Sequence, residues 1–280
     1  MWNNLNFMDC TNNIPIFDTL SHPTLNGNWM SPKYDKSCYI KDIITDMRTY
    51  NIKKAFAVGI NHIGDYDENR FINTVLNEGN DLFLPIAFFD FNNLSIKDIR
   101  YRLLEIKEKG YVGIKLHPRI ANFLLSDKRL PYIIDCSNEL DLLPMLCTFF
   151  YCNHQSMLDN NVDRLSELLL NCSVDSDIIL VHGGLTRLLE TMELVRFFPN
   201  AVLDLSLTMC KYEGTHIDFD IEYIFKFFDR RTVIGTDSPE INHETLRRRF
   251  DYFASKTTQE KAENIAYKNI ESVLNKHKII

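Results

Sequence analysis

The segment YVGIKLHP at residues 111–118 places a lysine and a histidine two positions apart in a short apolar run. Because alternate residues of a β-strand point to the same side, Lys115 and His117 would share one face. A buried lysine without a partner is costly, so such groups are normally paired or functional. The spacing raises the hypothesis that both side chains line a polar cavity.

Polar side chains also end several other apolar runs of the chain. His22 closes IPIFDTLSH, His182 precedes two glycines in DIILVHGG, Asp204 and Ser206 lie in AVLDLSL, and Asp237 lies in GTDSP. Histidine, lysine and aspartate gathered at one place are what metal-assisted or general acid–base hydrolysis needs.

Each of these residues taken alone also has an ordinary structural interpretation. His22 could satisfy a loop carbonyl, Asp237 could open a turn, and Asp204 could face a helix. Their joint placement at the ends of apolar runs favours a functional site. An inward-facing Lys115 could pair with Asp18 or Asp237, or carry its charge next to a substrate.

The elements that would position these residues form a regular series. Eight short apolar runs, typical of strands buried on both faces, alternate with segments of helical period, of which the clearest are 40–47, 95–110, 186–198, 242–255 and 258–276. This predicts an α/β fold, a (β/α)8 TIM barrel in which residues 1–280 form a single domain. A doubly wound open sheet is the alternative, but no GxGxxG or GxxxxGK[ST] motif supports it. The eight strands are expected at 14–22, 53–60, 82–90, 111–118, 143–150, 177–184, 201–207 and 232–239.

The amino-acid composition limits which kinds of molecule the protein is expected to bind. The net charge is −7 and there is no long basic run, so neither nucleic acid nor an acidic membrane is expected as a partner. The segment HETLRRRF at 243–250 is interpreted as a solvated helix face. The start MWNNLNFMDC does not resemble a signal peptide, and no apolar run approaches the roughly 20 residues that span a bilayer. With seven cysteines and no CxxC pair, we expect a cytoplasmic protein with reduced thiols.

Four motifs together resemble the amidohydrolase superfamily, specifically its amidohydrolase-related (amidohydrolase 2) branch. They are FDTLSHP, VGIKLHP, ILVHGG and GTDSP, in the family's order and spread over nearly the whole chain. The resemblance implies a (β/α)8 barrel and, most often, a hydrolase that uses a divalent metal, although decarboxylases and metal-independent lactonases occur. It also implies that Asp237 is the ligand and proton shuttle of the eighth strand and that His182 lies near the substrate.

The sequence departs from this family at two ligand positions. The family's first strand reads D-x-H-x-H, but Leu20 stands at the first histidine, and Thr148 or Cys147 stands at the ligand histidine of the fifth strand. Only His22 and Asp237 remain as metal ligands, whereas a catalytic zinc site typically has three. A site for one divalent metal such as Zn²⁺, with His117 or His182 as a further ligand, is one hypothesis. We prefer the hypothesis of a site without metal.

The leading functional hypothesis is a hydrolase of a small amide, lactone or ester that bears a carboxylate. Asp237 would activate water, while His182 and Lys115 would polarise the carbonyl. Arg119, His117 and Ser206 would bind the substrate, with Arg119 offering positive charge to its carboxylate.

Other hypotheses remain beside it. The loss of two ligand positions favours a lapsed barrel that acts as a small-molecule binding or interaction protein. A nuclease like the TatD group is disfavoured because Lys115 stands where that group has a glutamate. A thiol nucleophile at Cys147 or Cys152 is also disfavoured, since the sequence shows no base beside either thiol. The sequence leaves open whether the protein forms a homo-oligomer.

Overall fold

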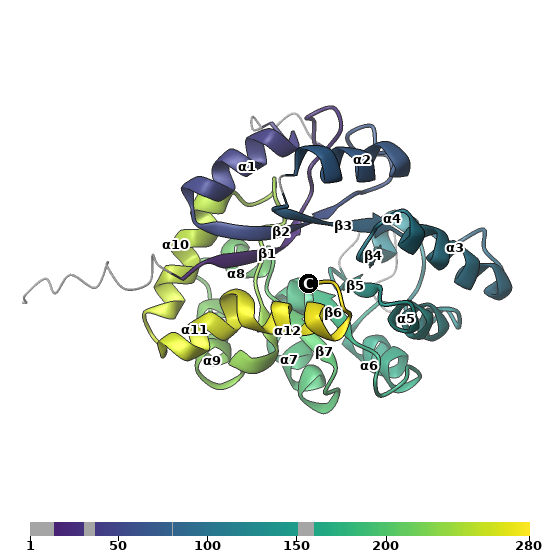
Figure 1. The fold of residues 1–280 in the computed structure, drawn as a ribbon. Helices are drawn as coiled ribbons and strands as arrows, with labels where there is room; N and C mark the ends of the chain where they lie inside the picture. Colours follow the sequence, from purple (N-terminus) through teal and green to yellow (C-terminus); the bar gives the residue numbers. More distant parts are fainter. Residues whose placement is uncertain (1–13, 31–36, 80, 151–159) are drawn as a thin grey trace, which may run out of the picture.

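The protein is built on one sheet of eight parallel strands that follow each other in sequence order. The computed structural model describes residues 14–30, 37–79, 81–150 and 160–280 (Figure 1). All eight predicted strands are confirmed: β1 (Ile16–Ser21), β2 (Ile52–Val58), β3 (Phe83–Phe88), β4 (Gly113–Leu116), β5 (Leu143–Cys147), β6 (Ile178–Val181), β7 (Ala201–Asp204) and β8 (Thr232–Val233).

The sheet closes on itself where the last strand meets the first. Although β8 is short, the chain beyond it continues alongside β1. The Thr19 amide donates to the Ile234 carbonyl at 3.1 Å, and the Asp237 amide donates to the Leu20 carbonyl at 2.8 Å. These bonds join the two edges and confirm the predicted barrel.

Helices connect successive strands and surround the sheet. No helix in the described ranges is long and apolar enough to cross a membrane. The helix expected from residue 186 begins later, because residues 182–187 form a tight turn, η1 (His182–Arg187), in which Gly183, Gly184 and Leu185 have positive φ. The helices are α1 (Ile40–Thr49), α2 (Glu68–Glu78), α3 (Ile96–Glu108), α4 (Pro118–Ala121), α5 (Leu130–Glu139), α6 (Val162–Leu170), α7 (Leu188–Phe197), α8 (Thr208–Lys211), α9 (Ile217–Phe227), α10 (His243–Ala254), α11 (Gln259–Glu263) and α12 (Asn269–Lys276), with the short 3₁₀ helix η2 (Asp229–Arg231) and the π-helix η3 (Asn264–Lys268).

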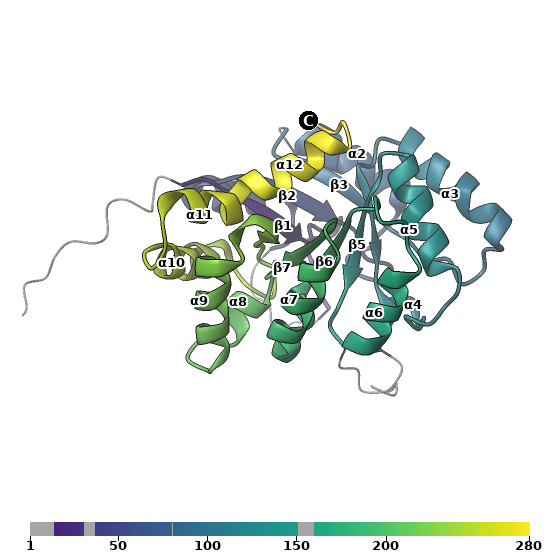
Figure 2. The same ribbon diagram turned by 90° about the horizontal axis from the view of Figure 1, so that it is seen from below.

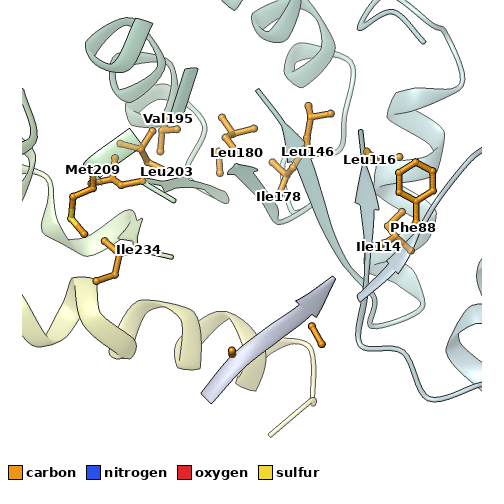
Figure 3. Close-up of a cluster of buried hydrophobic side chains, with 14 of the residues drawn as sticks. Phe88, Ile114, Leu116, Leu146, Ile178, Leu180, Val195, Leu203, Met209 and Ile234 are labelled. Atoms are coloured by element: carbon orange, nitrogen blue, oxygen red, sulfur yellow. The ribbon is translucent and has the colours of Figure 1, made fainter. Parts of the chain in front are cut away.

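Side chains along each strand alternate between two apolar layers. Ile114, Leu116 and Leu146 belong to the layer between sheet and helices (Figure 3). Met145 on β5 belongs instead to a separate cluster inside the barrel, which also contains Phe56, Val58, Ile86, Ile179, Val181, Val202 and Val233. By this alternation Lys115, between Ile114 and Leu116, points into the barrel.

The C-terminal helices cover the end of the barrel where the strands begin (Figure 2). Ile270 and Leu274 of α12 join the interior cluster. His277, just after α12, bonds at 3.0 Å through its Nε2 to Asp177, which directly precedes β6. The carboxyl ends of the strands, where barrel enzymes carry their sites, face away from this cover.

The segment predicted to be a solvated helix face is partly buried, and that prediction was wrong for two of its three arginines. Arg247 and Arg249 of α10 are buried, whereas Arg248 between them is exposed and pairs with Glu213. The Arg247 guanidinium donates to the carbonyls of Ile14, Tyr50 and Asn51 at 3.0–3.1 Å. Arg247 therefore ties α10 to the starts of β1 and β2.

Replacing this buried arginine is expected to destabilise the protein. Arg247→Met leaves three carbonyls with fewer donors, so we predict a loss of about 2–4 kcal/mol in the free energy of unfolding. Arg248→Met, next to it on the exposed side, should change that free energy by about 0.5 kcal/mol or less. Urea unfolding of both variants measures the difference. Equal losses would contradict the anchoring role of Arg247.

Candidate active site

The carboxyl ends of the strands bring most of the predicted residues together. Lys115 and His117 come from β4 and its end, Cys147 from the end of β5, His182 from the turn after β6, and Asp237 from the segment after β8. All five are buried. The charges of Cys147 and Asp237 both act on Lys115, and Cys147 lies against both histidines.

His22 and Asp237 form a buried pair at one side of this cluster. The His22 Nδ1 donates to the Val58 carbonyl at 2.8 Å, and its Nε2 lies 3.0 Å from Asp237 Oδ1. Burial raises the pKa of Asp237, but His182, His22 and Lys115 together hold it well below its usual range. Asp237 is thus a carboxylate at neutral pH, and each ring nitrogen of His22 faces an oxygen acceptor.

His182 is held by the end of β7. Its Nδ1 donates to the Ser206 carbonyl at 3.1 Å, which leaves Nε2 for the centre of the site. The Ser206 hydroxyl donates to Asp204 Oδ2 at 2.9 Å. Ser206 is completely buried, so its geometry favours positioning His182 over contacting a substrate.

Two of the site residues have left-handed backbone conformations. His182 has φ 72° and Asp237 has φ 62°. Non-glycine residues rarely adopt this region, and the cost of about 1–3 kcal/mol each is typical of functional sites. In both cases the strand has just ended, so the strained residue turns its side chain over the barrel mouth.

Cys147 is the residue whose surroundings the sequence did not reveal. The strand register sets Cys147 beside Val181, the residue before His182, and sets Leu146 beside Leu116, the residue before His117. Burial raises the pKa of this thiol, but the two histidines outweigh it and hold the pKa well below its usual range. The sequence alone shows no base beside Cys147, and the fold brings two histidines near it. Cys152 lies outside the described residues.

The two alternatives for the fifth-strand position are now separated. Thr148 donates its hydroxyl proton to the Val181 carbonyl at 2.7 Å and accepts from the Gly184 amide at 2.8 Å. Its hydroxyl therefore braces the turn after β6, and Cys147 is the residue that enters the site.

The hydrogen bonds of His117 fix its tautomer. The Ile120 amide donates to Nδ1 at 3.4 Å, so Nδ1 is an acceptor and the ring proton is on Nε2. Burial lowers the pKa of His117, which favours this neutral ring. Its Nε2–H is then the only hydrogen-bond donor of the ring.

Lys115 is the least compensated charge in the site. Its side chain is buried, and its Nζ has no hydrogen-bond partner among the described residues. Burial lowers its pKa. The predicted pairing with Asp18 is wrong: Asp18 accepts from Thr236 and lies 3.2 Å from His243. Asp237 and Asp204 are the carboxylates whose charge reaches Lys115.

Further positive charge lies at the rim of the site. The Arg119 guanidinium stacks on the Phe149 ring at 3.9 Å, and Lys211 lies 5.3 Å from the same ring. The edge of that ring in turn faces His182. Arg119 Nε is buried and has no hydrogen-bond partner in the part of the chain that the structure describes. An anionic ligand above Phe149 would meet both cations.

Solved structures with the same fold cover nearly the whole chain. An uncharacterized TIM-barrel protein from Bordetella bronchiseptica has a TM-score of 0.78 at 17% identity, over 94% of this chain and 99% of that one. A protein from Staphylococcus aureus described as an amidohydrolase has a TM-score of 0.65 at 16% identity, over 93% and 99%. The 5-carboxyvanillate decarboxylase LigW from Sphingomonas paucimobilis has a TM-score of 0.60 at 10% identity, over 94% and 99%. The chain shares the TIM-barrel fold of these proteins. No known family profile and no curated protein matches the sequence.

The residues at the strand ends do not fit the metal site that the resemblance to amidohydrolases implies. Leu20, at the first ligand position, is apolar, completely buried and part of the interior cluster. Within the described ranges, no group of three or more His, Cys, Asp or Glu side chains could hold a metal ion. Lys115 also stands among the remaining polar groups, where a protonated amine would repel a cation.

Asp204 generates a prediction about pH and stability. Burial raises its pKa to about 6, so the folded protein binds a proton there that the unfolded chain has lost. The stability that this proton supplies is present at low pH and is lost as the pH rises through 6. Relative to Asp204→Asn, wild-type unfolding free energy should fall by about 2–2.5 kcal/mol between about pH 4 and pH 7. Urea unfolding of both proteins across this range measures the difference, and a constant difference would contradict it.

Proposed function

We propose that the protein hydrolyses a small ester, lactone or amide that bears a carboxylate. The observation that carries this proposal is the buried ammonium of Lys115, which faces the ionised Asp237 and has no hydrogen-bond partner among the described residues. An unsatisfied buried cation beside a carboxylate can stabilise the oxyanion that forms during acyl transfer. The fold, shared with amidohydrolases and a decarboxylase, agrees with small-molecule chemistry at this end of the barrel.

The residues divide the chemistry between them. Lys115 stabilises negative charge on the carbonyl oxygen, and Asp237 takes a proton from the attacking water. His22, donating to Asp237 through Nε2, holds the carboxylate in position. His182 is the general acid for the leaving group, because Asp237 and Cys147 outweigh the effect of burial and raise its pKa.

The charge at the rim sets the class of substrate. Arg119 and Lys211 flank Phe149 where an anionic group above the ring would lie. A guanidinium forms paired hydrogen bonds with a carboxylate, and the free Arg119 Nε offers one donor. A substrate that carries a carboxylate a few bonds from its scissile carbonyl would engage Arg119 and Lys115 together.

The proposal is tested with activated esters and a carboxylate variant. The wild type should cleave mono-4-nitrophenyl glutarate with a higher kcat/KM than 4-nitrophenyl acetate. Asp237→Asn should lower kcat for the glutarate ester about 100-fold or more, because the proton acceptor is lost. The control Asp163→Asn changes an exposed carboxylate of α6 and should leave kcat unchanged.

Two results would contradict hydrolysis at this site. If Asp237→Asn retains wild-type turnover, Asp237 is not the proton acceptor. If the wild type binds glutarate by calorimetry but cleaves neither ester, the barrel is a binding protein, which is the lapsed-barrel hypothesis.

A further inference from the structure

The surroundings of Cys147 differ from those of an inert core thiol. Alternation along β5 points Cys147, like Met145, into the barrel. The register of β4, β5 and β6 sets Cys147 beside Val181, the residue before His182, and sets Leu146 beside Leu116, the residue before His117, so two histidines from different strand ends lie on either side of Cys147. Structural cysteines such as Cys172 and Cys210 lack this setting, and burial raises the pKa of each to about 12.

The two histidines have different roles toward the sulfur. His117 can only donate, since its Nδ1 accepts from the Ile120 amide and its proton is on Nε2. His182 can take a proton on Nε2, because its Nδ1–H is bound to the Ser206 carbonyl. Ser206 orients the base in this arrangement, so nucleophile, base and orienting group are all present.

A second and independent feature marks a place for the reacting carbonyl. The charges of Lys115 and Cys147 act on each other inside the barrel, and the Lys115 Nζ has no hydrogen-bond partner in the described ranges. A carbonyl oxygen directed at Nζ would satisfy the ammonium while its carbon approaches the sulfur. Donors aimed at the developing oxyanion are the usual complement of a cysteine nucleophile.

We propose that Cys147 is the nucleophile of this site and that hydrolysis proceeds through a thioester on its sulfur. This inference rests on the proposed hydrolase function and specifies its route. The barrel thus carries a cysteine–histidine pair on β5 and β6 in the region where the resemblance to amidohydrolases implies a metal.

Hydrolysis through the thioester has two half-reactions, acylation of Cys147 and hydrolysis of the thioester. The proton of the Cys147 thiol passes to His182 Nε2, the thiolate attacks the carbonyl carbon, and Lys115 stabilises the oxyanion. Collapse breaks the carbon–oxygen or carbon–nitrogen bond, and His182 protonates the leaving group. Water then attacks the thioester and gives its proton to Asp237, the carbon–sulfur bond breaks, and the thiolate leaves with the acid product. The proton passes from Asp237 to His182 and from there to the Cys147 thiolate, which restores the thiol and the neutral imidazole.

Acid-quenched intact-mass analysis after mixing with mono-4-nitrophenyl glutarate tests the thioester directly. Asp237→Asn retains nucleophile and base but loses the water-activating group, so it should accumulate a glutaryl adduct that maps to Cys147 and is removed by hydroxylamine. Cys147→Ser should form no such adduct and should lower kcat about 100-fold or more, with unchanged far-UV circular dichroism. Cys172→Ala, which removes a thiol far from the site, should match the wild type.

The outcomes separate the two proposals. If the wild type hydrolyses the ester, Cys147→Ser retains that activity and Asp237→Asn carries no adduct, water attacks directly. The covalent route is then wrong while the hydrolase function stands. If the wild type neither hydrolyses the ester nor acquires an adduct, the hydrolase function itself fails. An adduct that maps to another cysteine also overturns the assignment to Cys147.

Discussion

The burial of the Lys115 ammonium constrains the whole carboxyl end of this barrel. A lysine removed from water is held at a cost of several kcal/mol unless negative charge surrounds it. Asp237, Asp204 and the Cys147 thiol supply that charge. Each of them is in turn fixed by groups from other strands: His22 holds Asp237, Thr19 and Ser206 hold Asp204, and His117 holds Cys147. The site is therefore one connected network of charges, and a change to one member alters the electrostatic surroundings of the others.

This network accounts for the departures from the amidohydrolase pattern. Where a metal would supply positive charge, Lys115 brings its own, and Leu20 fills the first ligand position with apolar volume. The Nδ1 of His22 is bound to a backbone carbonyl, as it is in many histidines that ligate a metal through Nε2. The Nε2 of His22, however, bonds to the Asp237 carboxylate. The chemistry that we propose, a general base with an oxyanion-stabilising cation and a thiol nucleophile, uses only groups that the chain itself provides.

Much of this arrangement could be predicted from the sequence. The eight strands were visible as apolar runs, and strand parity alone placed Lys115 and His117 on one face. Cys147 could not be interpreted in the same way, because its histidine partners come from β4 and β6, and nothing in a linear sequence sets their relative positions. For the same reason the sequence offered Asp18 and Asp237 equally as partners of Lys115. In the fold, Asp18 bonds to Thr236 and lies beside His243. Arg247 and Arg249 looked like surface charges because three consecutive arginines hide which of them face the barrel.

The metal content of the protein tests the central claim most directly. Elemental analysis of protein purified without an affinity tag, before and after incubation with Zn²⁺ and desalting, measures whether the site holds a cation. The account predicts far less than one Zn, Mn, Fe or Ni per chain in both samples, because Lys115 occupies the site with its own charge. Close to one tightly held metal per chain, lost in a Cys147→Ser or Asp237→Asn variant, would contradict it and return the site to metal-assisted chemistry.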